Sequence, residues 1–243
     1  MSPRARYACL SIVVFSLAVW PACRDRLFDN PFDPDIGEAA FEVLQTLVAP
    51  ASAPRGLTWD GSLLWMVDGA SGSLAGLNPA SGAMIRSLSP PLSSAADAAA
   101  DGPDLWICGE GSTDVFKVNA LNGDIMKRLS LQRGSFTACE FAQGTLWLAD
   151  ALSNKILRVD PETAEVLGSF DNPGTRTAGL AFDGVRFWIS DPATLSIYEL
   201  DSTGRLVRKF LSPGPSPQGL AFDGRFLWNA DSNLRLYQLR LPS

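Results

Sequence analysis

Four aspartates recur at one position of an internal repeat and are the first candidates for chemistry. They share a place three residues after a tryptophan: Asp68, Asp150, Asp191 and Asp231. If these carboxylates converge on one face of the molecule, their hard oxygen atoms could hold Ca²⁺. Alternatively, each carboxylate caps a loop of its own repeat by accepting bonds from nearby backbone N–H groups. Because the residue returns in four repeats, we favour the loop cap and expect no cofactor, with Ca²⁺ as the alternative.

Glu140 is a single charge at a repeat position that is otherwise small. The residues at this position in the other repeats are Thr58, Ala99, Ala181 and Ala221. On an innermost strand, Glu140 would lie on the side opposite Cys139 and point toward the central channel. A carboxylate there needs a cation, an arginine or water to remain charged. Contact with a ligand or metal and a structural role are both open for Glu140.

Three arginines stand in or beside loops that enter the same strands: Arg55, Arg133 and Arg176. They could pair with Glu140, contact an anionic ligand or be solvated. Together with Glu140 and the four aspartates, they make up the candidate ligand face. We predict a protein or small-molecule partner on that face.

Composition excludes several kinds of chemistry. The 243 residues include no histidine, which rules out Ser-His-Asp and Cys-His catalysis and any metal site built on imidazole. The net charge of -6, without a basic run, argues against a nucleic-acid partner. Cys108 and Cys139 stand where other repeats have small or apolar residues, so we expect core thiols, with a disulfide between them as the alternative.

The candidate residues belong to a sequence phrase that occurs five times. The copies are GLTWDGSLLW from Gly56, DAAADGPDLW from Asp97, ACEFAQGTLW from Ala138, GLAFDGVRFW from Gly179 and GLAFDGRFLW from Gly219. Their tryptophans, spaced by 41, 41, 41 and 40 residues, are Trp65, Trp106, Trp147, Trp188 and Trp228. Such self-similarity indicates a repeat architecture, and we expect the tryptophans in the core between units rather than on a sugar-binding surface.

Each unit reads as four short strands joined by turns. Alternating apolar residues mark the strands, and Asp-Gly or Asn-x-x-x-Gly phrases mark the turns between them. The last unit stops after its third strand, at 236–239, whereas a spare strand at 42–47 precedes the first unit. We therefore predict an all-β fold: a five-bladed β-propeller of four-stranded antiparallel blades, whose ring is closed by the N-terminal strand (41–48) completing the last blade.

The N-terminus predicts export and a lipid anchor. Arg4 and Arg6 precede an apolar run at 8–20 that is short for a membrane span. The segment at 19–23, VWPAC, resembles a bacterial lipobox, which implies lipidation of Cys23; plain secretion and an uncleaved anchor are the alternatives. We predict a signal peptide at 1–22, an extended tether at 23–40 and the propeller at 41–243. The expected location is the bacterial cell envelope, at the outer membrane or cell surface, with membrane contact through the lipid only.

The repeat phrases resemble the NHL and YVTN-type propeller repeats of bacterial secreted and surface proteins over residues 41–243. That group includes gluconolactonase-like and streptogramin-lyase-like enzymes, and five-bladed glutaminyl cyclotransferases share the blade count. The resemblance implies a propeller whose members range from binders to lyases. The metal cluster of the first enzymes is matched only by Glu140, and the histidines of the second are absent. We therefore expect a lipid-anchored binding scaffold without catalysis, with a metal-dependent hydrolase or lyase as the alternative.

Overall fold

The computed structural model describes residues 39–242 of the chain. The described residues form strands and turns only, so this range holds no helix that could cross a membrane. The signal peptide, Cys23 and the tether up to residue 38 lie outside the described residues.

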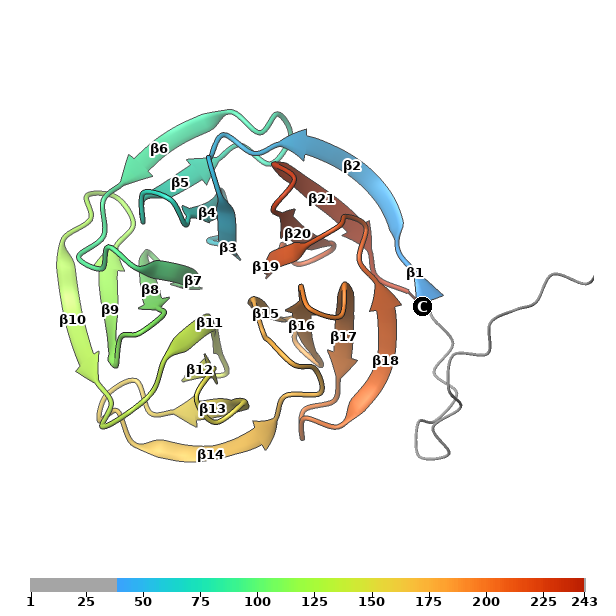
Figure 1. Ribbon diagram of the computed structural model, residues 1–243. Helices are drawn as coiled ribbons and strands as arrows, with labels where there is room; N and C mark the ends of the chain where they lie inside the picture. The colour runs from blue at the N-terminus through green and yellow to red at the C-terminus, as the bar shows by residue number, and fades with distance from the viewer. Residues whose placement is uncertain (1–38, 243) are drawn as a thin grey trace, which may run out of the picture. The chain divides into compact units, whose positions relative to one another are not determined.

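Five blades, each of four antiparallel strands, stand around one axis, as Figure 1 shows, and the predicted five-bladed β-propeller is confirmed. Blade 1 comprises β3 (Pro54–Trp59), β4 (Leu64–Asp68), β5 (Leu74–Leu77) and β6 (Met84–Leu88). Blade 2 comprises β7 (Ala95–Asp101), β8 (Asp104–Gly109), β9 (Asp114–Asn119) and β10 (Ile125–Ser130). Blade 3 comprises β11 (Phe136–Ala142), β12 (Thr145–Asp150), β13 (Lys155–Val159) and β14 (Val166–Asp171).

The last two blades involve the start of the described chain. Blade 4 comprises β15 (Gly179–Phe182), β16 (Phe187–Asp191), β17 (Ser196–Leu200) and β18 (Leu206–Leu211). Blade 5 comprises β19 (Pro217–Phe222), β20 (Leu227–Asp231), β21 (Arg235–Arg240) and β2 (Glu42–Val48). The antiparallel pairing of β2 with β21, which places Leu47 opposite Leu236, confirms the predicted ring closure.

A short strand that the sequence analysis did not predict lies at the end of the predicted tether. β1 (Ala39–Ala40) pairs in parallel with β18, with Ala39 opposite Phe210. The next residue, Phe41, stacks on Phe210 with 4.5 Å between the ring centroids and joins the apolar cluster between blades 4 and 5. The apolar packing of Phe41 therefore stabilises the course of the chain along β18 before it enters β2.

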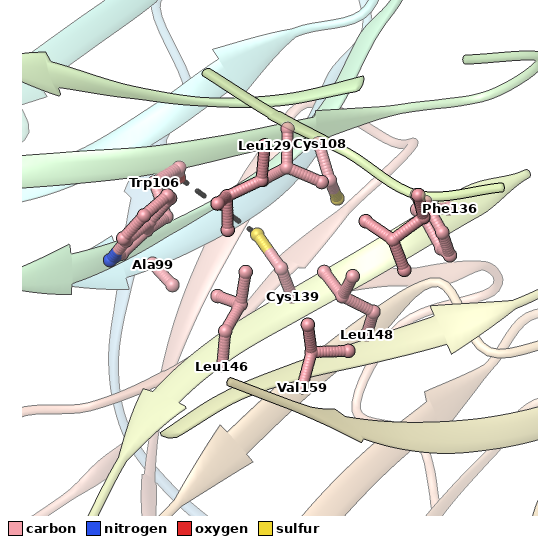
Figure 2. Close-up of a cluster of buried hydrophobic side chains, with 11 residues drawn as sticks. Ala99, Trp106, Cys108, Leu129, Phe136, Cys139, Leu146, Leu148 and Val159 are labelled. Atoms are coloured by element: carbon pink, nitrogen blue, oxygen red, sulfur yellow. Dashed lines mark hydrogen bonds between the residues drawn. The ribbon is translucent and has the colours of Figure 1, made fainter. Parts of the chain in front are cut away.

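The core lies between the blades, and each of five apolar clusters draws on two neighbouring blades. The five repeat tryptophans are buried in these clusters or beside them, as predicted. Figure 2 shows the cluster between blades 2 and 3, where the thiols of Cys108 and Cys139 lie among leucines. Both thiols are free and buried, so the structure has core cysteines rather than the alternative disulfide.

The innermost strands are packed tightly around the axis. β3, β7, β11, β15 and β19 each contact the next, and β19 contacts β3. A Cβ atom on Gly56 would lie 2.3 Å from the Cα of Asp97, and one on Gly219 would lie 2.3 Å from the carbonyl oxygen of Arg55. A side chain at Gly56 or Gly219 would therefore collide with the neighbouring backbone, whereas blades 2 and 3 have Asp97 and Ala138 at the equivalent position.

Candidate ligand site at the ring axis

The four repeated aspartates are engaged with the backbone of their own blades. Asp68 accepts hydrogen bonds from the amides of Ala53 and Ala70, at 3.0 and 3.1 Å. Asp150 accepts from the amides of Ser135 and Leu152 at 3.0 and 3.1 Å. In each case one bond comes from the loop that enters the innermost strand and the other from the turn after the second strand.

The two remaining members of this set have the same arrangement. Asp191 accepts bonds from the amides of Thr175 and Ala193, and Asp231 accepts from those of Ser216 and Asn233. Each carboxylate thus ties two loops of one blade together instead of meeting the others at the axis. Among residues 39–242, no group of three His, Cys, Asp or Glu side chains is placed to hold a metal ion.

The pKa values of the first two aspartates agree with this geometry. Burial alone would raise the pKa of Asp68 and Asp150, but the backbone N–H bonds favour the charged form and lower the pKa of both below the usual value. These carboxylates are therefore ionised at neutral pH and occupied by fixed donors.

Glu140 lies on β11, but the expectation that it points toward the central channel was wrong. Ala138 and Ala142, on the same side of this strand, pack in the cluster shared with blade 4, so Glu140 faces the following blade. Ala99, Ala181 and Ala221, at the same repeat position, each pack in the cluster shared with the next blade. Glu140 is half-buried, and none of the described residues forms a side-chain hydrogen bond or ion pair with it. Burial, and then the charge of Asp97, raise the pKa of Glu140 well above its usual value.

Asp97 is a buried carboxylate that the sequence analysis did not select. It occupies the position of Gly56, Gly179 and Gly219 on β7, and it is fully buried. Its carboxylate accepts bonds at 3.0 Å from the amides of Leu57 in blade 1 and Cys139 in blade 3. Burial raises the pKa of Asp97 well above its usual value, against the opposing effect of these amide bonds. Asp97 thus links the innermost strands of blades 1, 2 and 3. The sequence feature that could have identified it is a charged residue at a position that is glycine in three other blades.

Two of the three candidate arginines meet on one carboxylate, and it is not Glu140. The guanidinium groups of Arg55 and Arg176 lie 3.0 and 2.8 Å from the carboxylate of Glu110. Glu110 follows Gly109 at the end of β8, in the one blade that lacks the repeated aspartate. Of the possibilities left open for these arginines, pairing with Glu140 is not observed, because both guanidinium groups pair with Glu110 instead. Arg133 is exposed in the loop before β11 and has no ion-pair partner among the described residues.

The Arg55–Glu110–Arg176 group borders a depression at the mouth of the ring. The same position of all five innermost strands, or of the segments leading into them, lines it: Arg55, Ala96, Thr137, Ala178 and Gln218. Because one residue comes from each blade, the depression lies on the ring axis. It is shallow and open to solvent, with a cavity volume of about 10 Å³, which is room for about one water-sized group. We call this depression the axial mouth.

A second Arg–Glu–Arg group, in blade 4, has a buried carboxylate and serves as the comparison for a structural ion-pair group. Arg186 and Arg208 pair with Glu199, whose side chain is only 2% exposed. In the axial mouth, by contrast, 37% of the Glu110 side chain is exposed, with 33% for Arg55 and 51% for Arg176. The arginines of the axial mouth therefore do not compensate a buried charge, and solutes have access to them.

The side chains of the axial mouth are suited to bind an anion. Two guanidinium groups face one carboxylate, which leaves an excess of one positive charge in a chain of net charge -6. Guanidinium groups offer planar, paired N–H donors that match a carboxylate or a phosphate. Gln218 and Thr137 add neutral hydrogen-bonding groups to the lining.

Comparison with known proteins supports the fold and goes no further. No protein-family model and no curated protein matches the sequence. Glutaminyl cyclase from Myxococcus xanthus has a similar structure, with a TM-score of 0.71 and 15% identity over 83% of this chain and 96% of its own. A catalytically inactive virginiamycin B lyase from Staphylococcus aureus, determined with quinupristin, gives a TM-score of 0.52 and 19% identity over 79% of this chain and 67% of its own.

The selenomethionine-substituted form of the same lyase gives a TM-score of 0.51 and 20% identity over the same shares of both chains. At such identities the likeness shows the β-propeller fold alone, and the finer assignment to NHL or YVTN repeats stays a prediction. Both neighbours are enzymes by name, but the residues of the axial mouth must carry any functional argument for this chain.

Proposed function

We propose that this protein is a binding propeller that holds a small carboxylate-bearing ligand in the axial mouth. The observation that carries the proposal is the accessible pairing of Arg55 and Arg176 on the single carboxylate of Glu110. In the free protein Glu110 keeps the two guanidinium groups in place. A carboxylate of the ligand takes over some of their N–H donors, so binding is an exchange of one anion for another.

Electrostatics and geometry support this role over a purely structural one. Exposed ion pairs contribute about 0–1 kcal/mol to stability, so the fold has little need of this group. The three residues come from blades 1, 2 and 4, far apart in the sequence, yet their charged ends meet on the axis. The ring thus brings rigid strand ends together around one small volume, as binding sites require.

The location proposed for this binding propeller is the bacterial envelope, through a lipid on Cys23. The support is the lipobox-like sequence at 19–23 and the acidic propeller that follows it. A periplasmic or surface position would give the axial mouth access to small solutes from outside the cell.

Titration with succinate, followed by calorimetry at low salt, tests the axial mouth. We expect Arg55→Gln and Arg176→Gln to weaken succinate binding about tenfold or more, since each removes a charge-assisted bond worth about 1.5–3 kcal/mol. Glu110→Gln should instead strengthen binding, because it removes the anion with which succinate competes. The matched control is Arg128→Gln, which removes an exposed arginine paired with Asp114 in blade 2.

The direction of the Glu110→Gln effect decides between the alternatives. A structural ion-pair group predicts a lower melting temperature and no gain in affinity when Glu110 is neutralised. Absence of succinate binding to the parent protein, or equal effects of Arg128→Gln and Arg55→Gln, would contradict the proposed function.

A further inference from the structure

A second hollow lies beside the axial mouth, between blades 3 and 4. It is lined by residues that include Asp150, Asn154, Asn172 and Thr177, and it has a cavity volume of about 40 Å³. Two of its lining residues, Thr137 and Arg176, also line the axial mouth, so the two spaces are neighbours. We call this space the interblade hollow.

Thr177 gives the interblade hollow an unused hydroxyl group. The side chain is buried, with 5% of the residue exposed, and its Oγ1 atom has no hydrogen-bond partner among the described residues. A buried polar group without a partner costs about 1–3 kcal/mol, and such groups are rare in folded proteins. A hydroxyl held in this way at the wall of a hollow therefore needs an explanation.

The repeat shows that the fold does not require a hydroxyl at this position. Thr177 stands two residues before the glycine that opens β15, and the equivalent residues of the other blades are Pro54, Ala95, Phe136 and Pro217. All four are buried and apolar. Blade 4 alone places a polar side chain there, directly after Arg176 in the chain.

The other polar groups of the interblade hollow are already occupied. Asn172 donates to the Oδ1 atom of Asn154 at 3.0 Å and accepts a bond from the amide of Gly174 at 3.1 Å. The carboxylate of Asp150 holds backbone amides, and Lys155 pairs with Asp171 at 2.5 Å on the exposed rim. Thr177 Oγ1 and the half-exposed guanidinium of Arg176 are thus the groups left for a ligand.

We infer that the interblade hollow is a subsite for a hydroxyl group, which makes the ligand of the axial mouth a small hydroxy acid. This inference rests on the proposed function, because the carboxylate of that acid lies against Arg55 and Arg176. Its hydroxyl enters the interblade hollow past Arg176 and exchanges a hydrogen bond with Thr177 Oγ1, since each hydroxyl can donate and accept. Each of the two spaces has room only for small groups such as a carboxylate end or a hydroxyl, which favours a small molecule over a polymer.

Malate and succinate provide matched probes, because they differ by one hydroxyl group on the same dicarboxylate chain. We expect the parent protein to bind L- or D-malate about three- to tenfold more tightly than succinate, the effect of one hydrogen bond. In Thr177→Val, which keeps the shape and removes the hydroxyl, malate affinity should fall to that of succinate while succinate affinity stays the same. The melting temperature of unliganded Thr177→Val should rise, since an unpartnered polar atom is gone.

Thr145→Val is the control, because Thr145 is a buried threonine of the same blade pair whose hydroxyl is bonded to the carbonyl of Ala142 at 3.1 Å. This variant should lose some stability and keep the preference for malate. Equal affinities for malate and succinate in the parent, or a preference that survives Thr177→Val, would overturn the hydroxyl subsite and leave the axial mouth standing. Failure of both acids to bind the parent would overturn the proposed function itself.

Discussion

Trp147 shows how one substitution breaks the symmetry of the repeat. In the other four blades the indole N–H donates to an aspartate five residues earlier, at 2.6 to 3.1 Å. Blade 3 has Ala142 at that position, and the buried Nε1 atom of Trp147 has no partner within the described residues. The missing acceptor can be read from the sequence alone, but its consequence, a buried unpaired donor, needed the structure.

Restoring the aspartate should stabilise the protein. We predict that Ala142→Asp raises the free energy of unfolding by about 1–3 kcal/mol, because it supplies an acceptor for a buried indole N–H. Asp101 lies opposite Asp104 in the hairpin of blade 2, just as Ala142 lies opposite Thr145 in blade 3. The bond from the Trp106 indole to Asp101 therefore shows that an aspartate at this position can reach the tryptophan. Arg158, whose guanidinium lies over the Trp147 ring, would stand near the new charge.

Denaturant unfolding provides the measurement: a higher midpoint with an unchanged slope indicates a gain in stability. The converse variant, Asp101→Ala, should lower the midpoint, since it leaves Trp106 in the state that Trp147 has now. A midpoint for Ala142→Asp at or below that of the parent would show that burial of the new carboxylate outweighs the restored bond.

Glu140 should make stability depend on pH. Its pKa in the folded protein is raised well above the unfolded value of about 4.3, by burial and then by Asp97. The folded state therefore binds this proton more tightly than the unfolded state does. The resulting stabilisation is complete below the unfolded pKa and is lost as the pH rises toward the folded pKa.

Glu140→Gln should remove this dependence. We expect the variant to be more stable than the parent at pH 8, by on the order of 1 kcal/mol or more, and close to it at pH 4. Melting temperatures of both proteins across this range give the result. A variant that is less stable than the parent at pH 8 would show that Glu140 is charged and paired in solution, contrary to the contacts described above.

The innermost strands explain how much of the site could be predicted. Glu140 was selected because it is a charge at a repeat position that is otherwise small, and Arg55 and Arg176 were selected because they lie in or beside loops that enter the innermost strands. The partner of the two arginines was missed, since Glu110 is one residue beyond the repeated aspartate and its direction depends on how β8 ends. Thr177 was missed because a threonine before a strand is ordinary by itself. Only the packing of blade 3 against blade 4 shows that its hydroxyl is unpartnered.

The strands themselves were predictable, because period-two patterns and turn residues recur five times and correct one another. The closing strand β2 could be placed because the last blade lacked a fourth strand. β1 could not, since two residues carry no period and its pairing depends on the contact of Phe41 with Trp188 and Phe210. Strands that belong to the repeat can thus be predicted from the sequence, whereas a strand such as β1, which depends on a single tertiary contact, cannot.

The assembled propeller presents its candidate ligand groups at one end of the axis, so its value as a binder depends on where the molecule is held. Residues 1–38, which would decide this, lie outside the described residues. The sequence at 19–23 is the support for a lipid on Cys23, with the N-terminal Arg4 and Arg6 before the apolar run. An acidic chain has little attraction of its own for anionic membranes, so attachment would depend on the acyl chains.

Phase partition in detergent tests that attachment on the whole chain expressed in a bacterium. The parent should enter the detergent-rich phase, because burial of acyl CH₂ groups contributes about 0.8 kcal/mol each. Cys23→Ser should move the protein to the aqueous phase and leave its melting temperature unchanged, since the propeller begins only after the tether. The matched control is Cys9→Ser, a cysteine inside the apolar run that would be removed with the signal peptide, and it should partition like the parent. If Cys23→Ser still enters the detergent phase, or if Cys9→Ser leaves it, the proposed anchor is wrong, and the axial mouth would have to act in a protein that is secreted or held by its uncleaved N-terminus.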